Sequence, residues 1–161
     1  MTALNEGASQ KNPQQQKKPQ SQKSKLRLRA WLVMLRATRF MENTVRLKFR
    51  DQDSTLSRFD VMSVLDRYPD GLKMSEVSGK LKVSNGNVTG IIDRLVQDGL
   101  VIRQNDQNDK RVMFVKLTPQ GQTRFKLAAE KHEVWIADLL ADFTQDELTT
   151  LTKLLSRIGK V

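Results

Sequence analysis

The chain has 161 residues, of which 38% are hydrophobic, no cysteine, and a formal net charge of +10 at pH 7. This length allows one domain with a real core, and the lack of cysteine excludes disulfides, thiolate zinc sites and thiol-based redox sensing. No apolar run approaches the roughly 20 residues of a membrane span, and the N-terminus lacks the apolar region of a signal peptide. We therefore expect a cytoplasmic protein without a membrane partner, whose basic charge suits a polyanion.

Residues 1–24 consist mainly of Gln, Lys, Ser, Asn and Pro, with almost nothing to bury, and are predicted to be a disordered basic tail. Six of the ten net charges lie in residues 1–29, where seven basic residues are opposed only by Glu6. Two interpretations stay open: a solvated extension, or a tail that adds non-specific affinity for DNA.

The next segments have helical periodicity. Apolar residues at three- and four-residue steps predict a long helix over residues 25–50, whose apolar stripe is long enough to need a second chain. A second helix is predicted in "TLSRFDVMSVLDRYPDG", with Ser57 as its cap, and a short third helix in "KMSEVSGKLKV", with Ser75 as its cap. After a tight break at Val83, Ser84 caps a fourth helix, and Gly99 stands where a helix usually ends in the left-handed conformation. The expected buried stripe of this helix is Val88, Ile91 or Ile92, Leu95 and Val96.

Beyond Gly99 the period changes from 3.6 to 2. "LVIRQ" and "VMFVKLT", separated by "NDQNDKR", predict a hairpin with a charged tip. Thr118 and Pro119 then begin a helix that runs to about Asp142. Thr144 with Glu147 forms a capping box for a last helix, which carries Leu148, Leu151, Leu154, Leu155 and Ile158.

Two short helices joined by a tight turn are typical of a helix-turn-helix, and a hairpin directly after them indicates the winged variant. The N-terminal residues of the second helix in such a motif face base edges. Asn85, Asn87 and Thr89 are neutral donors and acceptors suited to bases or phosphates. The alternative is that they only cap the helix and face solvent, and the flanking helix and charged hairpin favour DNA binding over it.

The motifs "VSNGNVTGIIDRLVQDGLVIR" and "NDKRVMFVKLTPQG" resemble the MarR family (multiple antibiotic resistance regulators). The specific part of the resemblance spans about Lys73 to Gly121, and the flanking helices agree in order and length. "RATRFMENTVRLKFR" and "LSRFDVMSVLDRYPDGLKMSEVS" further resemble a proteobacterial branch that controls breakdown of hydroxycinnamates and related aromatic acids.

The resemblance implies a mainly α (α+β) winged helix-turn-helix fold, as an intertwined homodimer. It implies a single domain over residues 25–161, with dimerisation helices at 25–50 and 119–159 and a DNA-binding lobe at 55–117. Its DNA-contacting residues would be those of the recognition helix, Ser84, Asn85, Asn87, Val88, Thr89 and Arg94. Those of the wing would be Asp109, Lys110 and Arg111, where the arginine enters the minor groove and the aspartate orients it. Gly90 stands where several relatives carry an arginine, so no base contact is transferred to it.

An enzyme is not expected. The only histidine, His132, is not part of H-E-x-x-H, and with no cysteine it cannot build a usual zinc site. The sequence contains no G-x-S-x-G turn and no glycine-rich phosphate loop. We therefore expect no catalytic residue, no metal and no cofactor.

Several aromatic residues are candidates for an effector cavity: Trp31, Phe40, Phe59, His132 and Trp135. Taken singly, each is more simply an ordinary core or dimer-interface residue. Arg36 and Arg39 lie one helical turn from apolar neighbours, where a guanidinium either extends to water or pairs with a ligand carboxylate.

The sequence thus predicts a cytoplasmic homodimer that binds a pseudo-palindromic operator in double-stranded DNA. As a regulator, it would repress genes for aromatic-acid breakdown until a small aromatic carboxylate or aromatic acyl-CoA releases it. Two alternatives stay open: a DNA-binding regulator without an effector, and a winged-helix adaptor that binds protein.

Overall fold

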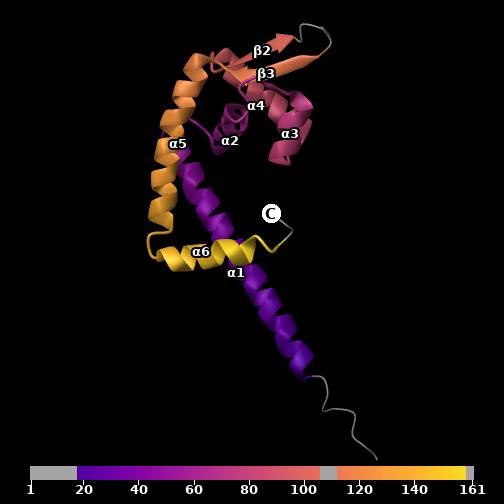
Figure 1. The fold of residues 1–161 in the computed structure, drawn as a ribbon, viewed down its shortest axis with the longest axis vertical. Coiled ribbons are helices and arrows are strands. Elements are labelled where there is room, and N and C mark those ends of the chain that lie inside the picture. The colour runs from indigo at the N-terminus through magenta and orange to yellow at the C-terminus, as the bar shows by residue number, and fades with distance from the viewer. Residues whose placement is uncertain (1–17, 106–111, 159–161) are drawn as a thin grey trace, which may run out of the picture. The chain divides into compact units, whose positions relative to one another are not determined.

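The computed structural model describes residues 18–105 and 112–158 (Figure 1). The chain forms two compact units, residues 1–42 and residues 43–161, and the first helix contributes to both. In chain order the elements are α1 (Lys18–Arg50), α2 (Leu56–Asp66), β1 (Leu72–Lys73), α3 (Met74–Leu81), α4 (Asn85–Gln97), β2 (Val101–Asn105), β3 (Met113–Leu117), α5 (Pro119–Leu139) and α6 (Gln145–Leu155). The predicted order of four helices, a hairpin and two helices is confirmed.

Helix α1 begins earlier than expected. Residues 18–24 were predicted to belong to the tail, yet they are helical. Gln and Lys are good helix formers, and Pro19 lies in the first turn, where its missing N–H costs no hydrogen bond. The remaining tail, residues 1–17, lies outside the described residues, so its disorder stays a prediction.

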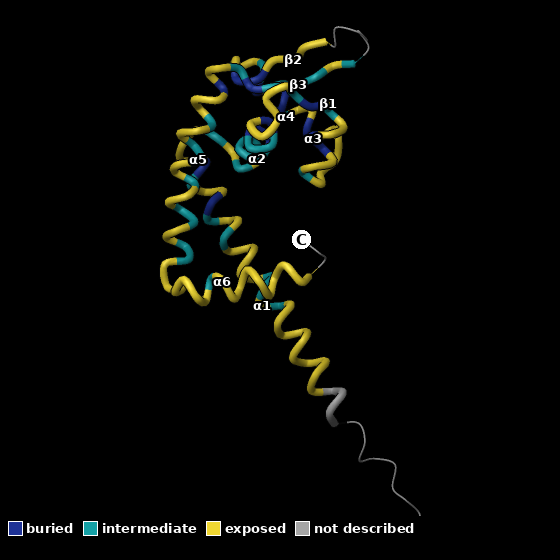
Figure 2. Tube along the Cα trace, viewed as in Figure 1, coloured by how far each residue is buried: buried dark blue, intermediate teal, exposed yellow. Residues whose placement is uncertain are grey.

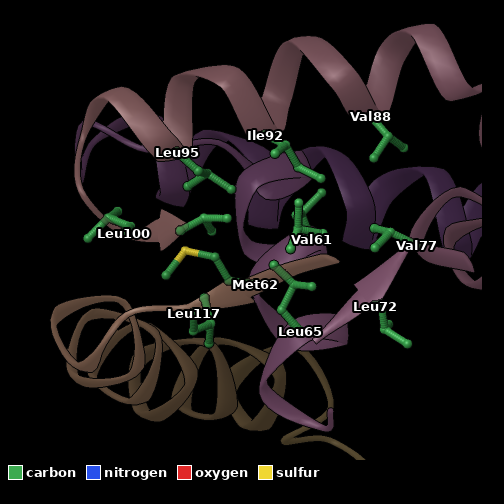
Figure 3. Close-up of a cluster of buried hydrophobic side chains, with 12 residues drawn as sticks. Val61, Met62, Leu65, Leu72, Val77, Val88, Ile92, Leu95, Leu100 and Leu117 are labelled. Carbon is green, nitrogen blue, oxygen red and sulfur yellow. The ribbon is translucent and has the colours of Figure 1, made fainter. Parts of the chain in front are cut away.

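The core of the second unit lies between α2, α3, α4 and the sheet (Figure 3). Helix α4 contributes Val88, Ile92 and Leu95, all fully buried. The spacing of four and then three residues places them on one face of the helix. Ile92, rather than Ile91, is therefore the fully buried member of the predicted stripe, and Ile91 and Val96 pack at its edge. The other buried members of this core are Val61, Met62, Leu65, Leu72, Val77, Leu100, Val101, Val115 and Leu117.

The turn between α3 and α4 is tight. Lys82 adopts the left-handed conformation with φ of 54°, and the Val83 N–H donates to the Ser78 carbonyl at 3.2 Å. Ser84 is the N-cap of α4, as predicted, although its side chain makes no capping hydrogen bond. α3 with α4 is therefore the helix-turn-helix.

Two predicted caps were wrong. Helix α2 is capped by Thr55, whose hydroxyl accepts from the Arg58 N–H at 3.2 Å, and Ser57 lies inside the helix. Helix α3 begins one residue before Ser75. Its N-cap is Lys73, whose N–H donates to the Glu76 carboxylate at 2.7 Å.

The sheet has the order β1-β3-β2 and is antiparallel throughout. β2 and β3 form the predicted hairpin, with Val101 opposite Leu117 and Asn105 opposite Met113. The two-residue strand β1 was not predicted, and it pairs through Leu72 opposite Val115. Gly99 has φ of +69°, so the predicted left-handed end of α4 is confirmed.

Two hydrogen bonds of the Thr118 hydroxyl hold the N-terminal end of α5. The Thr118 hydroxyl accepts from the Gly121 N–H at 2.9 Å and donates to the Gly99 carbonyl at 2.7 Å. Gly121 lies so close to Leu100 that a Cβ there would collide with its carbonyl group, whose carbon would be 2.9 Å away. The cap of α5 thereby ties this helix to the segment between α4 and β2.

Helix α6 begins with the predicted capping box, in which the Thr144 N–H donates to the Glu147 carboxylate at 2.8 Å and the Glu147 N–H donates back to the Thr144 hydroxyl at 3.3 Å. Helix α5 ends at Leu139, three residues before the predicted end. Helix α6 turns sharply away from the direction of α5 (Figure 1). Its described residues include no buried one (Figure 2), and its large apolar side chains are exposed at Leu151, Leu154 and Leu155, as is Ile158 just beyond it.

Candidate nucleic-acid interface and effector cavity

The face that α4 leaves exposed is polar and uncharged over its first turn. Ser84, Asn87 and Thr89 are exposed there, and Arg94 is exposed two turns on. Val88 is fully buried in the core. The prediction that Val88 contacts DNA was therefore wrong: this side chain anchors the helix to the lobe.

Two polar side chains of α4 are already hydrogen-bonded within the lobe. The Ser78 hydroxyl donates to the Asn85 side-chain oxygen, which joins α3 to the first residue of α4. The Thr89 hydroxyl donates to the Asn85 carbonyl at 2.9 Å. Asn85 keeps its amide donor and Thr89 keeps acceptor lone pairs. In a base contact, Asn85 would therefore act mainly as a donor and Thr89 as an acceptor.

Two glycines lie on the exposed face of α4. A Cβ built at Gly86 or at Gly90 would meet nothing within 4 Å, so the packing of the lobe requires neither glycine. Together with the short side chains around them, they let another molecule approach the helix backbone closely.

The wing residues lie in a segment that the structure does not describe. Asp109, Lys110 and Arg111 fall within residues 106–111, so their roles stay predictions. The base of the hairpin is joined to the recognition helix by an ion pair between Arg103 and Asp93.

A cluster of aromatic rings surrounds Phe49, which is 1% exposed. The ring centroids of Phe59 and Trp135 lie 4.9 Å and 5.0 Å from that of Phe49, and the centroid of His132 lies 6.0 Å away. His132 also lies 4.7 Å from Phe59. Three of the predicted ligand residues, Phe59, His132 and Trp135, are thus brought together around Phe49, which lies near the C-terminal end of α1.

A cavity of about 430 Å³ opens beside this cluster, entirely within the second unit. Phe49, Phe59 and Trp135 line it, together with apolar side chains of α2 and α5. Its charged lining residues are Arg58, Asp98, Arg124 and Lys131, with Asp53 from the loop before α2.

These charged groups differ in what they already bind. Arg58 forms an ion pair with Asp98, and Lys131 donates to the Gln52 side-chain oxygen. Arg124, on α5, has no hydrogen bond or ion pair within the described part of the chain. The cavity therefore combines an aromatic wall with one guanidinium that is available for an anion.

The predicted arginines are elsewhere. Trp31, Arg36 and Arg39 belong to the first unit, where they are exposed, and none is among the residues that line the cavity. Their ligand role stays a prediction. Arg58, Arg124 and Lys131 were missed, because no local pattern distinguishes them from other basic residues on a helix surface.

Burial lowers the pKa of His132 below its ordinary value. Removal from water disfavours the charged imidazole, and the ring lies stacked on Phe49 and tilted against Phe59. Within the described residues, no group of three or more His, Asp or Glu side chains is placed to hold a metal ion.

These elements define a winged helix-turn-helix DNA-binding lobe. Residues 54–113 match the MarR family. A MarR family transcriptional regulator from Silicibacter pomeroyi, solved as a crystal structure, is 34% identical, with a TM-score of 0.72 over 86% of this chain and 96% of that one. A mutant MarR from E. coli, solved in complex with operator DNA, is 26% identical with a TM-score of 0.70, covering 79% and 91% of the two chains.

Two curated relatives are regulators by name. The HTH-type transcriptional regulator PecS of Dickeya dadantii is 31% identical over 104 residues, which are 63% of either chain, a little under two thirds of that relative. The homoprotocatechuate degradative operon repressor of Escherichia coli is 25% identical over 77% of this chain and 83% of its own.

The chain belongs to the MarR family, and it is a DNA-binding transcriptional regulator. The predicted winged helix-turn-helix fold is confirmed by these structures. The expectation that the protein is not an enzyme agrees with its relatives, which are transcriptional regulators. None of the helices in the described ranges is both long and apolar enough to cross a bilayer.

Proposed function

We propose that the protein is a homodimeric repressor of the cytoplasm that leaves its operator when an aromatic carboxylate binds the cavity beside Phe49. The single observation that carries the effector class is the composition of this cavity: an aromatic wall, and Arg124 without a partner among the described residues.

The DNA contacts assigned to this regulator are those of the recognition helix and the wing. Ser84, Asn87 and the free groups of Asn85 and Thr89 face the base edges of the major groove. Arg94, Lys110 and Arg111 supply charge for phosphates and the minor groove. The exposure of the first turn of α4 supports this assignment.

The homodimer is supported by apolar surface that the single chain leaves in water. Leu154 is 51% exposed on α6, and in the first unit Trp31 is 54% and Phe40 65% exposed. Exposed apolar surface of this kind marks a contact with another chain, and two-fold pairing of one chain is the commonest solution. Sedimentation equilibrium tests it: we expect a dimer for the wild type and a shift toward monomer for Leu154→Glu.

The aromatic carboxylate is supported by size as well as chemistry. A volume of about 430 Å³ lies in the range of small-ligand pockets, roughly 300–1,000 Å³, and suits a single substituted ring. An arginine pairs with a carboxylate through two parallel hydrogen bonds. The name of the homoprotocatechuate operon repressor, which refers to the breakdown of an aromatic acid, points to the same class.

A thioester of coenzyme A is the second form that the effector can take. A neighbouring concavity shares Asp53, Ser54 and Arg58 with the first and adds Arg50 and Arg94. With the aromatic acyl group in the first cavity, the phosphates of a thioester would lie near these arginines. This places charge close to Arg94 of the recognition helix, where it would compete with DNA phosphates.

The test is an operator titration by fluorescence anisotropy with 4-hydroxycinnamate, benzoate, homoprotocatechuate and their coenzyme A thioesters. We expect at least one acid or thioester to weaken wild-type binding, and Arg124→Gln to lose most of that response. Lys126→Gln is the matched control, because Lys126 is exposed on the same helix outside the cavity. If no compound changes wild-type binding, the effector class is wrong. If Arg124→Gln responds like Lys126→Gln, the carboxylate is bound elsewhere.

A further inference from the structure

We propose that the ion pair between Arg58 and Asp98 is the switch of this regulator: the ligand carboxylate takes Arg58 from Asp98 and thereby loosens the attachment of the recognition helix to α2. This inference rests on the proposed function, since it names how occupancy of that same cavity reaches DNA.

The two partners connect the cavity to the recognition helix. Arg58 lies in the first turn of α2, and its side chain is 22% exposed. Asp98 is the C-cap of α4, directly after the last helical residue, and its N–H donates to the Arg94 carbonyl at 3.0 Å. Both side chains line the cavity. A movement of the Asp98 carboxylate therefore acts on the end of the helix that carries the DNA-contacting residues.

Among the cations of the cavity, Arg58 is the one that already holds a carboxylate. Lys131 donates to the neutral Gln52, and Arg124 has no partner within the described ranges. An anionic ligand that reaches Arg124 enters a space in which Asp98 is already present. Two carboxylates within about 4–6 Å disfavour each other, so the ligand and Asp98 compete for the Arg58 guanidinium.

Packing and backbone hydrogen bonds also hold this end of α4: Leu100 is buried, and the Thr118 hydroxyl donates to the Gly99 carbonyl at 2.7 Å. Its middle is anchored by Val88, Ile92 and Leu95 in the core, whereas Asp98 is followed by Gly99 in the left-handed conformation. The one other ion pair of α4 among the described residues joins Asp93 to Arg103 of β2 and lies outside the cavity. Separation of Asp98 from Arg58 thus removes the ion pair that joins the end of α4 to α2, while the packing of Leu95 and Leu100 in the core stays.

The linkage between ligand binding and operator binding fixes the direction in which Asp98→Asn changes each affinity. A ligand can shift a two-state equilibrium only by its differential affinity for the two states, and the coupling is reciprocal. Asp98→Asn removes both the tether and the charge that repels the ligand. We expect this variant to resemble the liganded wild type: weaker operator binding without ligand, tighter binding of the acid, and little further response to it.

The solvent exposure of Asp98 limits how far its ion pair can change operator affinity. The Asp98 side chain is 48% exposed, and a solvent-exposed pair of this kind changes an affinity by at most about fivefold per protomer. We therefore expect operator affinity to fall by up to about fivefold per protomer for ligand-free Asp98→Asn, and the ratio of operator Kd with and without ligand to fall toward one.

The experiment measures this ratio for the full chain with 4-hydroxycinnamate and benzoate as anionic probes and cinnamyl alcohol as a neutral one. Binding of each probe is followed separately by tryptophan fluorescence. Asp93→Asn is the matched control, because it removes an ion pair of the same helix that does not line the cavity. Asp98→Glu restores the carboxylate and should recover the response.

Three results support the switch when they occur together: the anionic probes act on wild type and Asp93→Asn, cinnamyl alcohol acts on neither, and Asp98→Asn binds the anionic probes without responding. If Asp98→Asn responds as strongly as Asp93→Asn, the switch is wrong and the proposed effector class survives. If no probe binds the wild type, both the effector class and the switch are overturned.

Discussion

Replacement of Gly90 by alanine should stabilise the protein while it weakens operator binding. Gly90 lies inside α4 on its exposed face, and a Cβ there would meet nothing within 4 Å. A helical glycine is less stable than alanine by roughly 0.5–1 kcal/mol. For a chain of this size, a gain of 1 kcal/mol raises Tm by about 2–4 °C.

The expected weakening of DNA binding has a steric cause. If the face of α4 that carries Gly86 and Gly90 lies against base edges, an added methyl group moves the helix backbone outward. Hydrogen bonds from Asn87 then lengthen, and each good base contact is worth about 1–3 kcal/mol. We therefore expect Kd for the operator to rise at least severalfold in Gly90→Ala, with a smaller change for non-specific DNA, which is held through phosphates.

The assay combines thermal unfolding followed by circular dichroism with anisotropy titrations on operator and on scrambled DNA. Gly121→Ala is the contrasting variant: its Cβ would collide with the Leu100 carbonyl group, so it should lower Tm. If Gly90→Ala raises Tm and binds the operator as tightly as the wild type, the helix does not approach the groove through this face.

Three other predictions concern charge. Arg111→Ala should raise the operator Kd at least about tenfold, since a charge-assisted hydrogen bond contributes about 1.5–3 kcal/mol, and normal affinity with unchanged circular dichroism would remove the wing assignment. Deletion of residues 1–17, with Lys11 and Lys17, should flatten the log–log salt dependence by roughly 0.9 for each phosphate that the tail neutralises in the wild type; equal slopes would leave the tail a solvated extension. Since burial lowers the pKa of His132, the folded state binds fewer protons than the unfolded state just below pH 6.5, so its contribution is present above that pH and is lost as pH falls through the folded pKa. Tm measured from pH 7.5 to 5 should therefore fall less steeply in His132→Phe than in the wild type, and equal slopes would show that other groups govern this range.

The fold was predictable wherever a local signal is strong. The 3.6-residue period of α4, the change of period at Gly99 and the caps at Thr118 and Thr144 all agree with the structure. The cap at Ser57 was wrong because Thr55, an equally good cap, stands two residues earlier, and the cap at Ser75 was wrong because the Glu76 carboxylate accepts from the Lys73 N–H, so that α3 begins without a capping hydroxyl. β1 was missed for a related reason: two residues form a strand only because β3 pairs with them from a distant part of the chain.

The effector cavity was predictable only in part. Aromatic residues on the apolar stripes of two helices, α2 and α5, gave Phe59, His132 and Trp135, because an apolar stripe must face a neighbour. No comparable sequence pattern marks the basic residues that line the same cavity. Arg58 and Arg124 lie on different helices, and only the packing of α5 on α2 brings them to one space. Arg36 and Arg39 have the same local pattern, an arginine one turn from apolar residues, so sequence alone could not separate the two pairs.

The described face of α4 separates specificity from affinity. Its first turn is uncharged, and Asn85 and Thr89 already use part of their hydrogen bonding inside the lobe, so this face contributes mainly selectivity among bases and little counterion release. We expect the charge that a DNA polyanion requires to come from Arg94, from Lys110 and Arg111 of the predicted wing, and from the basic N-terminal residues. Changes in the first turn of α4 should consequently alter the ratio of operator to scrambled-DNA affinity at a constant salt slope, while removal of wing or N-terminal charges alters the slope.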